Sequence, residues 1–189
     1  TIRDFAPVSL VANNVEVFVV NQANPARDAS EFVRAAKAEK QPPAIASSGQ
    51  GSIPHLALVQ LEEATQVKFL HVPYKGMSLA MTDLMGGHIP LMFDGMATSL
   101  PMIKAGSLKA LAVSSAKRSD AAPELPTVAE VTGYKDFDFT LWQGFFAPRG
   151  TPPDVIARLN GEINKILADP AVRQKLIDAG ANVASMSID

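Results

Sequence analysis

Short apolar runs alternate with amphipathic stretches from Val15 to Val113. The runs are strand-sized and contain many β-branched residues, whereas the stretches between them repeat apolar residues at helical spacing. We expect strands at Val15–Val20, Ala44–Ala46, Lys68–Val72, Ile89–Phe93 and Leu108–Val113. We expect helices at Asp28–Glu39, from Ser52 through Leu61, from Ser78 to Met85 and from Thr98 to Ala105. This alternation predicts an α/β lobe in which a parallel sheet is covered by helices on both faces.

The pattern changes after Ser114. A polar, proline-bearing stretch follows, and then three helices and one strand are expected: a helix at Thr127–Val131, a strand at Leu141–Ala147, a helix from Thr151 and a helix from Asp169 to its C-cap Gly180. The last two helices have no parallel sheet of their own in this sequence. Their apolar faces therefore need another partner.

The composition is that of a globular chain and excludes several functional classes. Of 189 residues, 47% are hydrophobic and 19% are charged. The formal net charge is -2 with no basic stripe, so no nucleic-acid partner is expected. No stretch approaches the roughly 20 apolar residues of a membrane span. The sequence has no cysteine, which excludes disulfides and thiolate chemistry and is compatible with a bacterial periplasmic protein.

One turn of the predicted sheet has the composition of an anion site. In open α/β sheets, ligands bind at the carboxyl ends of strands, against the starts of the following helices. The turn Ser47-Ser48-Gly49-Gln50-Gly51-Ser52 has this position. Its glycines let the backbone approach a ligand, its serines offer hydroxyls, and the helix start offers unpaired N–H groups. A serine-rich turn that only caps a helix has the same pattern. Pro54 breaks the dinucleotide fingerprint, and no P-loop lysine follows.

Two further turns follow neighbouring strands. In Pro73-Tyr74-Lys75-Gly76, Tyr74 offers a hydroxyl, Lys75 can pair with a carboxylate, and Gly76 opens another helix start. A lysine in such a turn is, however, more commonly a solvated surface residue. Asp94 follows the strand that ends at Phe93, where it can accept a hydrogen bond from a ligand or cap the next helix.

No catalytic or metal-binding constellation is visible. His55, His71 and His88 fall in a helix, a strand and a turn without metal-ligand spacing, so each is expected to be structural. The adjacent Glu62 and Glu63 point to different faces of a helix and do not make an acid–base pair. We therefore expect no enzyme activity, no metal and no cofactor. The aromatic residues Trp142, Phe145 and Phe146 are expected in the core.

A family resemblance rests on many short motifs in order. They are Phe5–Val8, Ser47–Ser52 with His55-Leu56, Val72–Gly76, Asp83–Gly87, Met92–Asp94, Ile103–Gly106, Leu111–Val113, Pro126–Glu130 and Gly144–Pro152. Together they resemble the tripartite tricarboxylate transporter substrate-binding family, also called the Bordetella uptake gene family. The resemblance covers essentially the whole chain.

The resemblance implies a two-lobed periplasmic binding protein of type II, which closes on a ligand between its lobes by a hinge motion. It implies capture of a di- or tricarboxylate, an acidic amino acid or an aromatic acid for the membrane permease subunits of a transporter. The loops 47–52 and 74–76 and Asp94 would form the ligand face of the second lobe. Departures at Gln50–Pro54, Met77 and Gly95 leave the identity of the carboxylate open.

The resemblance also predicts an incomplete first lobe, because the family usually carries an N-terminal third that this sequence lacks. Residues 1–20 and 114–189 would be the remnant of that lobe with its hinge strands, and residues 21–113 would be the second α/β lobe. Apolar surface left exposed could then drive self-association. Two alternatives remain: the ligand-sensing effector domain of a regulator, against which the lack of a helix-turn-helix argues, and an enzyme with a flavodoxin-like or dinucleotide-binding sheet.

Overall fold

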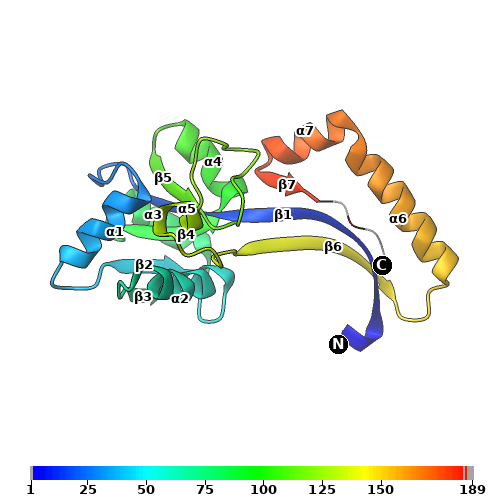
Figure 1. The fold of residues 1–189 in the computed structure, drawn as a ribbon, viewed down its shortest axis with the longest axis horizontal. Helices are drawn as coiled ribbons and strands as arrows, with labels where there is room; N and C mark the ends of the chain where they lie inside the picture. The colour runs from blue at the N-terminus through cyan, green and yellow to red at the C-terminus, as the bar shows by residue number, and fades with distance from the viewer. Residues whose placement is uncertain (1, 185, 187–189) are drawn as a thin grey trace.

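A single long strand runs through both halves of the molecule. The computed structural model describes residues 2–184 and 186, and in it β1 (Phe5–Asn21) is 17 residues long. Its C-terminal half pairs with β4 (Leu91–Gly95) and β5 (Leu108–Val113). Its N-terminal half pairs with β6 (Thr140–Pro148) and β7 (Ala181–Val183). β1 therefore joins an α/β lobe, which contains β2 to β5, to an arm, which contains β6, β7 and the last two helices (Figure 1).

Four strands of the lobe share one direction. β2 (Ala44–Ser47) is parallel to β3 (Leu70–Pro73) and to β4, in the order β3-β2-β4-β1-β5. β1 lies between β4 and β5 and is antiparallel to both. The expected α/β fold is confirmed, but the sheet is mixed, and the parallel direction predicted for Val15–Val20 was wrong. An apolar run that is buried on both faces looks the same in either direction, so its pattern does not report strand direction.

Capping residues set the starts of several helices. Asp28 caps the first helix by accepting a hydrogen bond from Glu31 N, and Thr127 forms a capping box with Glu130. The helix expected from Thr98 begins two residues earlier. The helices are α1 (Ala29–Ala38), α2 (Ile53–Thr65), α3 (Met77–Met85), α4 (Met96–Lys104), α5 (Val128–Thr132), α6 (Pro153–Ala168) and α7 (Pro170–Asp178), after a short 3-10 helix at Ile2–Asp4.

The lobe has one apolar core on each face of its sheet, as expected. Alternate residues of β1 belong to different cores because successive side chains of a strand point to opposite faces. Phe18 and Val20 pack with residues of α1, α2 and α5, whereas Val17 and Val19 pack with residues of α3 and α4. All four side chains are fully buried. Apolar side chains and helices thus cover both faces of the sheet in its middle. Polar groups that can meet a ligand are therefore expected at the edges of the sheet.

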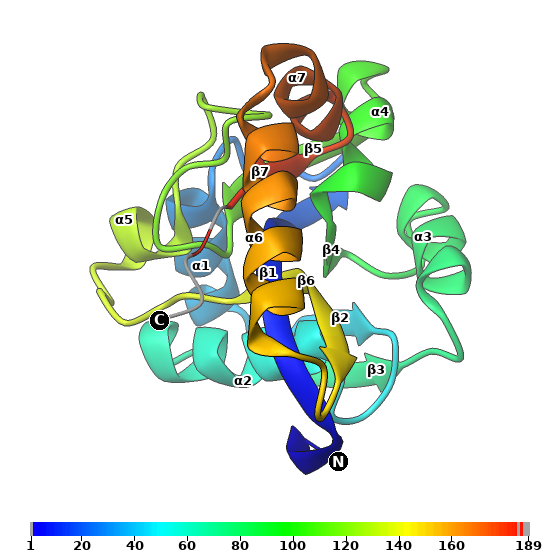
Figure 2. The same ribbon diagram turned by 90° about the vertical axis from the view of Figure 1, so that its right-hand side faces the viewer.

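The arm is a curved ribbon of β1 and β6 against which α6 lies (Figures 1 and 2). The register between the two strands shifts between Pro7 and Ser9 and again between Leu10 and Ala12. Asn160 of α6 donates a buried hydrogen bond of 2.7 Å to the carbonyl oxygen of Val8. Because β1 contributes to the lobe and to the arm, the division into residues 21–113 and the remaining segments stays a prediction.

Much of the arm's apolar surface is exposed. Trp142 and Phe145 of β6 each expose 57% of their surface, so their predicted core positions were wrong. The apolar residues of α6 are also only partly covered, with Leu159 and Ile166 exposed. The sequence pattern identified these residues as apolar, but within the described chain their side chains remain largely uncovered. Among the described residues, no helix has the length and apolar character needed to cross a bilayer.

Two glycines of the arm should respond oppositely to the same substitution. At Gly180, φ is +82° and an added Cβ would lie 2.7 Å from Ala97 N, where the α7–β7 turn meets the start of α4. Gly161 lies inside α6 with nothing within 4 Å of an added Cβ. We expect Gly180→Ala to lower the free energy of unfolding by about 2 kcal/mol. Gly161→Ala should raise it by about 0.5–1 kcal/mol. Urea denaturation of both variants measures these changes in the free energy of unfolding. Equal changes in the two variants would contradict the close approach of position 180 to Ala97.

Candidate functional site

Three polar turns lie at one edge of the lobe. β3, β2 and β4 are parallel neighbours, so their carboxyl ends fall together. The backbone N–H of Tyr74 donates to the carbonyl oxygen of Ser47 over 2.9 Å, which ties the second turn to the first. Asp94 follows two residues after the β4 residue that pairs with Ala46. The structure therefore brings together at one edge the three segments that sequence analysis singled out.

The first turn is held by hydrogen bonds within itself. Ser52 lies at the N-cap of α2, but its hydroxyl donates to Gly49 O over 2.7 Å and not to the helix. The hydroxyl of Ser47 donates to Gly49 O and accepts from Gly49 N, each over 3.1 Å. Gly49 and Gly51 have φ of +126° and +75°, which side chains rarely tolerate. Two of the three serine hydroxyls thus face inward, and Ser48 and Gln50 are left on the outer side.

Two histidines lie directly beneath this turn. The rings of His55 and His71 stack with centroids 4.1 Å apart and planes 14° apart. His71 Nε2 lies 2.6 Å from Ser47 Oγ, and His55 Nδ1 accepts a hydrogen bond of 3.0 Å from Gly51 N. Burial, and then the neighbouring His55, lower the pKa of His71. Sequence analysis missed this pair because His55 and His71 lie on different elements, α2 and β3, and no spacing rule links them.

The second turn combines a hydroxyl that is hydrogen-bonded within the lobe with an exposed lysine. Tyr74 Oη donates to Asp83 Oδ2 of α3 over 2.6 Å. This hydrogen bond is the main reason that the pKa of Tyr74 rises to about 12. Lys75 is exposed, and Gly76 has φ of +135° at the N-cap of α3. The turn therefore presents Lys75 and a helix start, whereas the Tyr74 hydroxyl points back to the lobe.

The third turn ties β4 to α4. Asp94 exposes only 3% of its surface, and its Oδ2 accepts from Thr98 Oγ1 over 2.5 Å and from Ser99 Oγ over 2.6 Å. Gly95, not Asp94, occupies the N-cap position of α4. The carboxylate thus fixes the first turn of the helix through two hydroxyls.

Glu16 is a further buried carboxyl at this edge, and sequence analysis did not single it out. It pairs with Gly95 across the β1–β4 ladder and exposes 6% of its surface. Its Oε2 has no hydrogen-bond partner among the described residues. Burial first, and the charge of Asp94 second, raise the pKa of Glu16 to about 7. The available signal was a lone charge inside the apolar run Val15–Val20.

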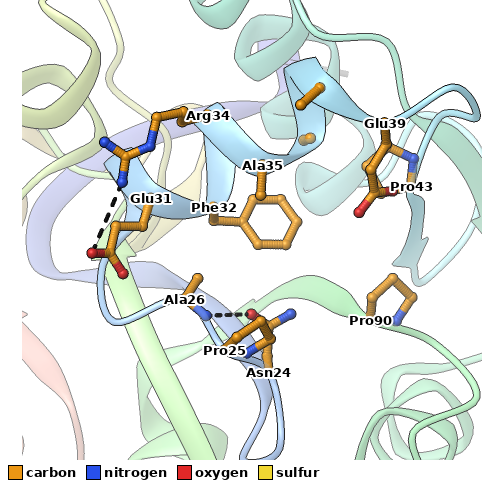
Figure 3. A pocket seen from close by; sticks show the side chains of 12 residues that line it. Asn24, Pro25, Ala26, Glu31, Phe32, Arg34, Ala35, Glu39, Pro43 and Pro90 are labelled. Atoms are coloured by element: carbon orange, nitrogen blue, oxygen red, sulfur yellow. Dashed lines mark hydrogen bonds and ion pairs between the residues drawn. The ribbon is translucent and has the colours of Figure 1, made fainter.

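The largest cavity described lies elsewhere. Its volume is about 570 Å³, and its lining includes Phe32 and Ala35 of α1 together with Pro43 and Pro90 (Figure 3). Pro43 and Pro90 come just before β2 and β4, so this cavity sits at the amino ends of the strands. It is therefore at the opposite edge of the sheet from the three turns.

Solved structures with this fold define the class of the protein. R. palustris Rpa4515 with adipate has a TM-score of 0.85 at 30% identity, over 99% of this chain and 62% of that chain. The periplasmic binding protein BugD has a TM-score of 0.76 at 35% identity, over 95% and 60%. MatC from Rhodopseudomonas palustris with bound malate has a TM-score of 0.75 at 30% identity, over 95% and 60%. The fold, with polar turns at the carboxyl edge of its sheet, is that of a type II periplasmic binding protein.

Sequence comparison places the chain in one family of this class. The model of the tripartite tricarboxylate transporter family receptor matches residues 1–189. A protein encoded in the tcbD-tcbE intergenic region of Pseudomonas sp. (strain P51) is 40% identical over 182 residues, which are 96% of this chain and 54% of that protein. The chain belongs to this receptor family, whose members are solute-binding proteins. It spans about half the length of such relatives.

Glu16→Gln should stabilise the protein more as the pH rises. The folded-state pKa of about 7 lies above the ordinary glutamate value of 4.5, so the cost of ionising the buried carboxyl is absent below pH 4.5 and complete above pH 7. We expect the variant to gain about 2–3 kcal/mol over the parent at pH 8.5 relative to pH 4.5, measured by urea denaturation. Glu63→Gln, on the exposed face of α2, is the matched control. A gain that does not change with pH would refute the shift.

Proposed function

We propose that this protein captures a small carboxylate in the periplasm and delivers it to the membrane permease subunits of a tripartite tricarboxylate-type transporter. The observation that carries the proposal is the convergence of three helix starts at one edge of the lobe. The amino ends of α2, α3 and α4 follow the carboxyl ends of β2, β3 and β4, where unpaired N–H groups and helix dipoles favour a negative charge.

The distribution of acidic residues supports an anionic ligand. The first turns of α2, α3 and α4 contain no acidic residue. By contrast, the first turns of α1, α5 and α6 contain Glu31, Glu130 and Asp154. A carboxylate in the first turn would stabilise a helix, and it would also compete with an anion for the same N–H groups. The first turn of α7 also contains no acidic residue, but there the N-cap side chain of Asp169 accepts from Ala171 N and Val172 N. The starts of α2 and α3 have no such side-chain cap.

The backbone of the first turn offers donors to such a ligand. Gly49 and Ser52 use their N–H groups within the turn, and Gly51 donates its N–H to His55 of α2. Among the described residues, the N–H groups of Ser48 and Gln50 have no such bond. Lys75 adds an exposed positive charge on the neighbouring turn. We propose the residues Ser47, Ser48, Gly49, Gln50, Gly51, Ser52, Tyr74, Lys75, Gly76 and Asp94 as the ligand-binding edge, in which Tyr74 and Asp94 act by fixing α3 and α4.

The class of ligand follows from chemistry and from the relatives. Two structures of similar fold carry adipate and malate, which are both dicarboxylates. If this chain binds a similar ligand, its ligand is a di- or tricarboxylate. Acidic amino acids and aromatic acids are the other ligand classes that we propose. We assign no catalytic step to the site. The match to a transporter receptor family over the whole chain gives the regulator alternative no support.

A charge placed at the start of α3 should separate stability from binding. Ser78 is exposed in the first turn of α3, so Ser78→Glu should leave the helix as stable as before or stabilise it by up to about 1 kcal/mol. The same charge should repel an anionic ligand and weaken adipate or malate binding by about tenfold in calorimetry.

The controls place the effect at this edge. Ser78→Gln tests side-chain size without charge. Ser30→Glu adds the same charge in the first turn of α1, which starts beside the cavity at the opposite edge of the sheet. Affinity that is unchanged in Ser78→Glu, or equally reduced in Ser30→Glu, would remove the α3 start from the site. All of these binding measurements use the full-length protein.

A further inference from the structure

We propose that His55 and His71 are positioning residues, which as a neutral stacked pair hold the turn 47–52 in the shape that presents its outer N–H groups to the ligand. The proposal rests on the proposed function of that turn. It adds a role for two side chains that sequence analysis assigned to structure alone. Neither histidine has to touch the ligand.

The contact of His55 fixes one glycine of the turn directly. Gly51 N donates to His55 Nδ1 over 3.0 Å, so Nδ1 must be unprotonated for this bond to exist. Gly51 has φ of +75° and an exposed position, and no other hydrogen bond of its N–H is present in the described structure. The bond to His55 therefore turns the Gly51 N–H inward.

The contact of His71 fixes the other glycine through Ser47. The buried Ser47 hydroxyl lies 2.6 Å from His71 Nε2, and it donates to Gly49 O over 3.1 Å in the tautomer that has its proton on Nε2. The same oxygen accepts from Gly49 N, and Gly49 has φ of +126°. Both glycines with positive φ are thus connected to the histidine pair, Gly51 by one hydrogen bond and Gly49 by two in series.

The stacked geometry opposes protonation of both rings at once. Two imidazolium rings with centroids 4.1 Å apart would repel each other, and His71 is partly buried. Both effects lower the pKa of His71, burial more than the charge of His55. A pKa below 6.5 in the folded state means that the neutral arrangement is fully favoured above pH 6.5 and is opposed increasingly as the pH falls below it.

The other charged groups on these elements are occupied or distant. On α2, Glu62 pairs with Lys68 at the far end of the helix, and Glu63 is exposed there. On the turn after β3, the Tyr74 hydroxyl is bonded to Asp83, and Lys75 is exposed. Among the described residues, His55 is the one group whose charge contributes to the shift of His71. Acidification therefore acts on this turn through the two histidines, and it should weaken the binding of a carboxylate.

Isosteric variants separate positioning from structure. Asn at position 55 keeps an acceptor near the place of Nδ1 and does not titrate, whereas Ala removes the acceptor. With adipate as the probe in calorimetry at pH 7.5, we expect His55→Ala to weaken binding about tenfold and His55→Asn to stay within about twofold of the parent. Between pH 7.5 and 5.5 the parent should lose affinity, and His55→Asn should lose less. His71→Gln, which keeps a donor near the place of Nε2, should behave like His55→Asn.

A readout without ligand completes the test. The amide resonance of Gly51 should titrate with the histidines in the parent, shift in His55→Ala at pH 7.5 and stay near its parent position in His55→Asn. His88→Asn, in an exposed turn before β4, is the control and should change neither readout. Affinity that rises on acidification and is lost in His55→Asn would show a cationic histidine binding the ligand, and would overturn the proposal.

These experiments distinguish a failure of the proposed function from a failure of the positioning role of the two histidines. If neither adipate nor malate binds at any pH, the proposed function fails for these ligands, and the Gly51 resonance still decides whether the histidine pair holds the turn. If adipate binds but its affinity has the same pH dependence in the parent and in His55→Asn, the positioning role is wrong while the proposed function stands.

Discussion

The arrangement depends on one strand that is hydrogen-bonded on both sides over residues 12–14 and again over residues 17–20. Within the lobe, β1 separates β4 from β5, and within the arm it pairs with β6 and β7. Its central residues fill both cores of the lobe, so the strand cannot shift along its axis without exposing Val17 or Phe18. This fixed register also sets Glu16 beside Gly95, at the edge where the helix starts converge.

The candidate edge combines groups that favour an anion with two buried carboxyls. Helix starts without acidic residues and the exposed Lys75 favour negative charge, whereas Asp94 and Glu16 oppose it. The conflict is reduced locally: Asp94 accepts two hydroxyl protons, and the raised pKa of Glu16 keeps much of that side chain neutral near pH 7. Asp94 thus shares its turn with the start of α4, Glu16 lies on β1, and Lys75 lies on the turn after β3.

The sequence indicated the elements of the lobe well, because apolar periodicity and caps such as Asp28 and Thr127 act over a few residues. It also indicated the three turns, since parallel strands bring their carboxyl ends together. It did not indicate the direction of β1 or the stacking of His55 on His71, which depend on distant pairing. The prediction that Trp142 lies in the core failed for a related reason. An apolar side chain favours burial, but only the tertiary structure shows whether another element packs against it.

The interrupted register of the β1–β6 ribbon has a geometric consequence. Bulges sharpen the bend and twist of a paired strand, and here the two unpaired residues of β1, Val8 and Val11, are only three positions apart. Both fall on β1 and none on β6, so β1 has two residues more than its partner over this stretch. The curvature of the arm is therefore encoded in this short segment of one strand.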